Sequence, residues 1–199
     1  MFVLYALVVA IPLGLLLGGR FERLGEVTVR WAPLAVVGLA VQLVLFAEPV
    51  ARTVGDAGPP IYVASTALVL AVVLANLRLR GVPLIAVGAA SNLLAIVANR
   101  GYMPADPAAL AAAGEAVGEG YSNSVVVAEP ALAPLTDIFA TPSWLPLSNV
   151  FSIGDVLIAV GLAWAVVAAM RGVVRNRTAP IVAGGTGTNG PSQPGVGRG

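Results

Sequence analysis

The stretch that decides the fold is the apolar run from Val150 to Met170, VFSIGDVLIAVGLAWAVVAAM. It contains one charged residue, Asp155, close to its start. A helix that crosses a membrane needs about 20 mostly apolar residues, within a range of roughly 17 to 25. The run therefore predicts a membrane-spanning helix whose single acid lies at one edge of the lipid.

The composition extends this expectation to the whole chain. Of its 199 residues, 58% are hydrophobic and 11% are charged, and the mean hydropathy is +0.90. A soluble domain carries about a quarter charged residues, so lipid is expected to surround much of this surface. Aromatic residues make up only 6% of the chain, whereas outer-membrane barrels carry aromatic girdles. We predict an all-α fold, a polytopic membrane helix bundle.

Four more apolar segments approach the length of a span, and the arginines orient the resulting five. These segments are residues 2–19, 32–50, 60–77 and 82–98. The connections and the tail on one side carry nine arginines: Arg20, Arg23, Arg30, Arg78, Arg80, Arg171, Arg175, Arg177 and Arg198. The opposite side carries only Arg52 and Arg100. Because basic residues are retained in the cytoplasm, we expect the N-terminus outside and the C-terminus inside a bacterial cytoplasmic membrane.

These spans predict one transmembrane helical domain over residues 1–177 and a disordered cytoplasmic tail over 178–199, which is rich in Gly, Pro, Thr and Ser. The outer loop, residues 100–149, is long enough to suggest a role. Within it, Asp106 and Pro107 predict the start of a short helix that runs to Val117 and stops at Gly118 and Gly120. The run Val125–Val127 predicts a short strand or an extended stretch.

The residue inventory restricts the chemistry. The chain has no Cys and no His, which removes thiolate and imidazole metal ligands and the usual proton shuttle at neutral pH. We therefore expect no metal and no cofactor. Two acids, Asp137 and Asp155, lie in apolar surroundings at the same predicted face. Two carboxylates that share a site can hold one proton between them, and one can then act as a base toward water.

Simpler interpretations stay open for each candidate. Ser152 and Asp155 form an S-x-x-D pattern before an apolar run, which is a capping box. Asp137 fits a solvated turn or a helix start. Gly88, Ser91, Asn92 and Asn99 fall near one face of the fourth span. That face is either a packing surface between helices or the wall of a polar pocket.

The stretch from Leu135 to Gly161 resembles the carboxy-terminal part of bacterial lipoprotein signal peptidases. Leu135-Thr136-Asp137-Ile138-Phe139 is similar to their V-x-D-F-I motif, and Phe151-Ser152-Ile153-Gly154-Asp155 is similar to F-N-x-A-D. The resemblance implies that Asp137 and Asp155 form a catalytic pair. Asn92, in the run Gly88–Leu94, corresponds to the asparagine of the family's G-N-x-x-D-R region.

The chain as a whole resembles a different family. The segment Asn99-Arg100-Gly101-Tyr102-Met103-Pro104 and the ending Phe151–Gly161 are similar to an uncharacterised bacterial family of small membrane proteins, a domain of unknown function. This resemblance implies no activity.

The most concrete functional hypothesis is an aspartyl-dyad, peptidase-like membrane hydrolase at the outer face. Asp137 and Asp155 would be catalytic, and Asn92, Asn99, Arg100 and Ser152 would line the pocket. Its partners would be the lipid bilayer and a membrane-protein or lipoprotein-like substrate, with no nucleic acid. The alternatives are a non-enzymatic membrane subunit or assembly factor that docks a partner through its outer loop, and a small-solute transporter.

Overall fold

The computed structural model describes residues 2–114 and 124–173, and most of these are helical. Five long helices each overlap one of the predicted spans: α1 (Phe2–Leu16), α2 (Ala32–Leu45), α4 (Gly58–Ala75), α5 (Val82–Ala98) and α7 (Ile153–Met170). The bounds of α5 coincide with those predicted. The predicted tail over residues 178–199 lies outside the described residues.

Two helical stretches, Gly55–Ala75 and α7, are long and apolar enough to cross a membrane, and α1, α2 and α5 are shorter apolar helices. The predicted spans 2–19 and 32–50 are both longer than the helices that form. Gly18, in the left-handed region at φ 76°, turns the chain away shortly after α1. Pro49 cannot donate an N–H to the Leu45 carbonyl, so α2 ends and a separate short helix, α3 (Glu48–Ala51), follows.

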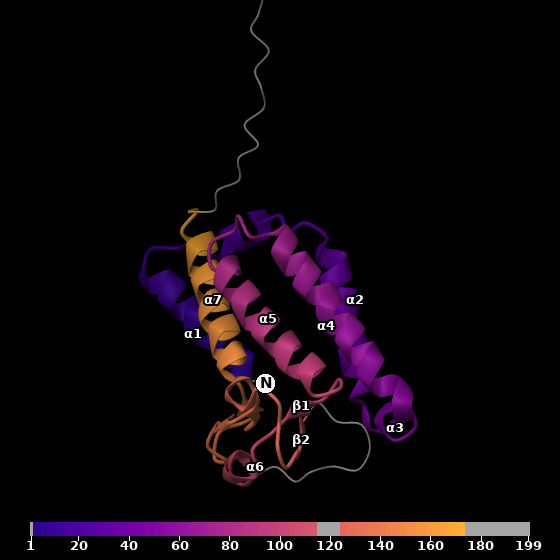
Figure 1. The fold of residues 1–199 in the computed structure, drawn as a ribbon. Helices are drawn as coiled ribbons and strands as arrows, with labels where there is room; N and C mark the ends of the chain where they lie inside the picture. The colour runs from indigo at the N-terminus through magenta and orange to yellow at the C-terminus, as the bar shows by residue number, and fades with distance from the viewer. Residues whose placement is uncertain (1, 115–123, 174–199) are drawn as a thin grey trace, which may run out of the picture.

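The long helices lie side by side in a row whose order differs from their order in the chain. The last helix, α7, packs against α1 on one side and against α5 on the other. Next to α5 lies α4, and α4 in turn packs against α2 (Figure 1). Because each end of the row has only one neighbour, the helices keep broad apolar faces on the surface.

Glycines bring α5 and α7 close together. A Cβ atom on Gly88 would collide with the backbone carbonyl oxygen of Gly154, and one on Gly161 would lie 2.7 Å from the Gly81 carbonyl oxygen. Small residues at such positions allow the backbones of apolar helices to approach closely. The packing interpretation of Gly88 therefore agrees with the structure.

Short elements between α5 and α7 form a cap over one end of the row. They are β1 (Met103–Pro104), α6 (Pro107–Ala113), β2 (Ser124–Val125), η3 (Ala133–Leu135), β3 (Phe139–Ala140) and β4 (Val150–Phe151). β1 pairs in parallel with β2, and β3 pairs in antiparallel with β4. Buried Ala105, Ala109, Leu110, Ala113 and Val150 form its small core.

Two predictions for this segment can be compared with the structure. Asp106 caps α6 as expected, because its carboxylate accepts hydrogen bonds from the amides of Ala108 and Ala109 at 2.8 and 3.0 Å. The helix ends earlier than predicted, since α6 stops at Ala113 and Gly114 adopts the left-handed conformation that terminates helices. The predicted stop at Gly118 and Gly120 lies outside the described residues. Within the run Val125–Val127, which was predicted to be a short strand or extended, Val125 lies in β2.

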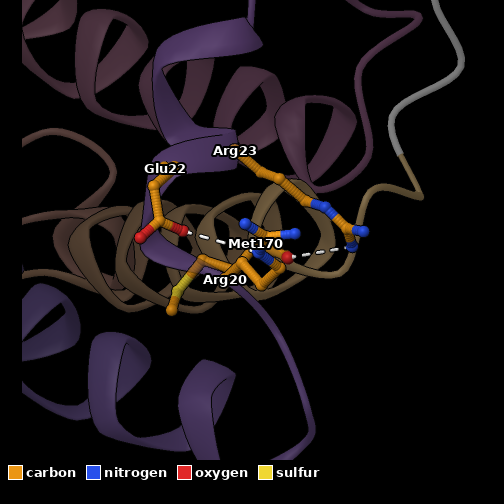
Figure 2. Close-up of polar contacts among 4 residues, drawn as sticks. All are labelled: Arg20, Glu22, Arg23 and Met170. Atoms are coloured by element: carbon orange, nitrogen blue, oxygen red, sulfur yellow. Dashed lines mark hydrogen bonds and ion pairs between the residues drawn. The ribbon is translucent and has the colours of Figure 1, made fainter.

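The cap, α3 and the amino terminus lie together at the lower end of the view, and the carboxyl end of α7 lies at the opposite end (Figure 1). There the 3-10 helix η1 (Phe21–Glu26) closes over α7. The amide of Arg20 donates to the Met170 carbonyl oxygen at 2.8 Å, and the Arg23 guanidinium reaches the same oxygen at 3.5 Å (Figure 2). Cations and donors here satisfy carbonyls that a helix leaves without partners.

Candidate functional site

Asp155 forms the capping box that the sequence predicts. Ser152 is the N-cap of α7, and its hydroxyl oxygen accepts a hydrogen bond from the Asp155 amide at 3.1 Å. In return, the Ser152 amide donates to Oδ2 of Asp155 at 3.0 Å. These two bonds satisfy amide groups that the first turn of a helix would otherwise leave without partners. The negative carboxylate also lies at the positive end of the helix dipole.

Asn92 of α5 joins this box across the helix interface. Its Nδ2 donates to Oδ1 of Asp155 at 2.9 Å, and its Oδ1 lies 2.9 Å from the Ser152 hydroxyl. Ser152 is fully buried, so its single hydroxyl proton is shared between Asn92 and Asp155 Oδ2, 3.0 Å away. We call Asn92, Ser152 and Asp155 the α5–α7 polar cluster.

The tight approach of α7 makes this cluster geometrically possible. A Cβ atom on Gly154 would overlap Oδ1 of Asn92. Any larger residue at that position would therefore push the Asn92 amide away from Ser152. The glycine next to Asp155 thus has a specific role, which is to leave room for the side chain that binds the capping box.

Asp137 lies in the cap, between η3 and β3. It is 5% exposed. Its amide donates to the Pro104 carbonyl oxygen at 2.9 Å, and its own carbonyl oxygen accepts from the Asp106 amide at 3.0 Å. Asp137 therefore extends the pairing of the cap strands through a bridge to Ala105.

The hydrogen bonds of the Asp155 carboxylate, within residues 2–114 and 124–173, go to Asn92 and Ser152. Asp137 is not among these partners. The structure therefore brings three of the six predicted site residues, Asn92, Ser152 and Asp155, into one cluster, and Asp137 lies in the cap. The catalytic pairing of the two acids stays a prediction from sequence.

Asn99 and Arg100 line a separate pocket at the end of α5. The Asn99 side chain forms a two-way pairing with the backbone of Ala131: Nδ2 donates to its carbonyl at 2.9 Å, and Oδ1 accepts from its amide at 2.9 Å. Nδ2 also donates to the Ala95 carbonyl at 2.8 Å. Asn99 thus fastens the returning segment of the cap to α5 instead of facing an aspartate.

The pocket beside this anchor has a volume of about 460 Å³. Arg100, Tyr102 and Glu129 contribute polar side chains to its lining, and Ala98 and Val125 are among its apolar walls. Asn99 and Arg100 were predicted from the sequence to line a pocket, whereas Glu129 and Tyr102 were not. The residue types alone gave little indication, because Glu129 lies in a loop 30 positions from Asn99 and only the cap topology brings them together.

In the part of the chain that the structure describes, no three acidic, His or Cys side chains gather in a way that could hold a metal ion. The amide, hydroxyl and carboxylate groups of the α5–α7 polar cluster are instead occupied with one another. Such an arrangement can hold two helices in register. Three of about four acceptor positions of the Asp155 carboxylate are thereby used.

The family model described as "Family of unknown function (DUF5317)" matches residues 26–167, which is most of the chain. The chain belongs to this family. The DUF5317 match includes α2, α4, α5, the cap and most of α7, and it confirms the expected membership of an uncharacterised family. No curated protein and no solved structure matches the chain.

Proposed function

We propose that this DUF5317 chain is a non-enzymatic, five-span protein of a bacterial cytoplasmic membrane that binds a ligand in the pocket of its outer cap. The observation that carries the proposal is the state of Asp155, whose two carboxylate oxygens are both hydrogen-bonded within the α5–α7 polar cluster. A general base needs access to a proton it can abstract. A carboxylate that caps α7 and accepts a hydrogen bond from α5 is better suited to joining these two helices.

The distribution of charge supports five spans with the cap outside. Among the described residues, the η1 end of the row carries six arginines and two acids: Arg20, Arg23, Arg30, Arg78, Arg80, Arg171, Glu22 and Glu26. The cap end carries two arginines and six acids: Arg52, Arg100, Glu48, Asp56, Asp106, Glu129, Asp137 and Asp155. Retention of the arginine-rich end in the cytoplasm orients the cap toward the outside.

The absence of cysteine from the chain provides a clean test of this topology. Gly25→Cys introduces a thiol in η1, where an added Cβ meets no other atom within 4 Å. Ala128→Cys introduces one at an exposed position of the cap. In intact cells, we expect a membrane-impermeant maleimide to label Ala128→Cys at once and Gly25→Cys only after permeabilisation. The reverse pattern would overturn the proposed orientation.

Cleavage of a membrane-anchored lipopeptide separates this proposal from the hydrolase hypothesis. If the protein is not an enzyme, we expect reconstituted wild-type protein and the variants Asp137→Asn and Asp155→Asn to give equal, background cleavage. Cleavage by the wild type that disappears in both variants, while both remain inserted and folded, would establish the aspartyl pair and refute a purely binding role.

A further inference from the structure

The cap pocket has the size and polarity of a ligand site. Its volume of about 460 Å³ lies within the range of roughly 300 to 1,000 Å³ that is usual for small-molecule pockets. Its lining combines apolar residues with four polar ones, Asn99, Arg100, Tyr102 and Glu129, of which Arg100 and Glu129 are solvent-exposed. Asn99 is already engaged with Ala131, so the charged groups are the ones that can select a ligand.

Those two groups carry opposite charges and do not pair with each other. Among the described residues, the ion pairs are Arg20 with Glu22 and Arg52 with Glu48. Arg100 and Glu129 therefore line one pocket with their charged atoms more than 4 Å apart, an arrangement that suits a ligand carrying both signs of charge. A guanidinium fits phosphate oxygens in a bidentate manner, and a carboxylate accepts hydrogen bonds from a primary ammonium.

The backbone at Arg100 adds a second observation. Its φ is 58°, in the left-handed region, where a residue with a Cβ is strained and glycine is not. Gly101 follows at φ 89°, and a Cβ there would lie 2.8 Å from the Cα of Pro59. The turn thus tolerates strain at an arginine that lines the pocket.

The pocket continues onto an apolar helix face. Ala98 lines the pocket, and Leu94 and Val87 precede it on α5 by four and eleven positions, which places all three on one stripe. Leu94 is 54% exposed and Val87 is 57% exposed. A charged pocket at the end of such a stripe matches the shape of a phospholipid, whose headgroup is polar and whose acyl chains are apolar.

We infer that the pocket binds a phospholipid with a zwitterionic headgroup of phosphate and primary ammonium, as in phosphatidylethanolamine. The phosphate binds Arg100, the ammonium binds Glu129, and the acyl chains lie along Leu94 and Val87 of α5. This inference rests on the proposed function, since it requires the cap end of α5 to lie at the membrane surface.

The test is native mass spectrometry of the full chain, in detergent, with phosphatidylethanolamine, phosphatidylglycerol and phosphatidylcholine of identical acyl chains. We expect the wild type to retain the ethanolamine lipid about tenfold more than the other two, which is the ratio that one charge-assisted hydrogen bond supplies. Glu129→Gln should abolish this preference. Arg100→Gly, which suits the left-handed backbone, should reduce the binding of all three lipids.

Arg52→Gln is the matched control, because Arg52 lies at the same end of the molecule but pairs with Glu48 outside the pocket. It should leave the preference unchanged. Equal retention of the three lipids by the wild type, or full binding by Arg100→Gly, would overturn the inference. Soluble phosphoethanolamine that binds as tightly as the lipid would also overturn it, since the α5 stripe would then contribute nothing. Cysteine labelling of the Gly25→Cys and Ala128→Cys variants in intact cells separates this failure from a failure of the proposed topology.

Discussion

The contact between Asn92 and Asp155 makes the sharpest stability prediction. Asp155→Ala removes the return bond of the capping box and the bond from Asn92, both made to a charged acceptor. A hydrogen bond to a charged group contributes about 1.5–3 kcal/mol and a helix cap about 1 kcal/mol, with some overlap here. We expect Asp155→Ala to lower the free energy of unfolding by about 2–3 kcal/mol and Asn92→Ala by about 1–2 kcal/mol.

The double variant should lose less than the sum of the two single variants. Once either partner is absent, removal of the other breaks no bond between them, so the coupling energy should be about 1 kcal/mol. The measurement is SDS-induced unfolding of the purified protein in detergent, followed by tryptophan fluorescence, for which Trp164 lies on α7.

A second cycle with Asn99→Ala and Asp155→Ala provides the control. Asn99 bonds to Ala95 and Ala131 and shares no partner with Asp155, so these effects should add to within about 0.5 kcal/mol. If the Asn92 cycle is equally additive, Asp155 does not join the two helices, and the structural account of this acid fails.

The remaining predictions concern backbone positions and the cap anchor. Gly154→Ala should lower the free energy of unfolding about as much as Asn92→Ala, because the new Cβ occupies the space of the Asn92 amide. Adding Asn92→Ala to Gly154→Ala should then lower it little further. Chemical denaturation of the single and double variants measures both effects. Asn99→Ala should raise hydrogen exchange at Ala131 and its neighbours while leaving α7 protected, since it removes both anchoring bonds. Arg100→Gly should be more stable than Arg100→Ala by about 1 kcal/mol, because only glycine avoids the left-handed strain; equal stabilities would show that the strain is absent.

The sequence was sufficient to locate the five long helices because their signals are local. The apolar run of α5 lies between the turn at Gly81 and the polar Asn99, and its predicted bounds match the structure. The capping box of Ser152 and Asp155 was also visible, since both residues lie within one turn of α7.

The contacts between distant segments could not be predicted in the same way. Asn92 lies 63 positions before Asp155, and nothing in the local pattern distinguishes a packing asparagine from one that lines a pocket. The pairing of Asp137 with Asp155 was predicted from two acids in apolar surroundings at one predicted face and from the resemblance, neither of which determines the path of the cap strands. In the structure, backbone hydrogen bonds with Pro104 and Asp106 fix the position of Asp137 in the cap, and its catalytic pairing with Asp155 stays a prediction.

Asparagine performs the same structural task at both ends of the helix row. Asn76, at the end of α4, accepts from the Arg30 amide at 2.8 Å and donates to the Arg30 carbonyl at 2.9 Å, just as Asn99 does with Ala131. A side-chain amide offers one donor and one acceptor in nearly the geometry of a peptide group. It carries no charge, so its burial among apolar helices avoids the cost of desolvating an ion. A chain in which only 11% of the residues are charged can therefore anchor its connecting segments with neutral amides, and in the proposed lipid complex Arg100 and Glu129 are the charges that select the ligand.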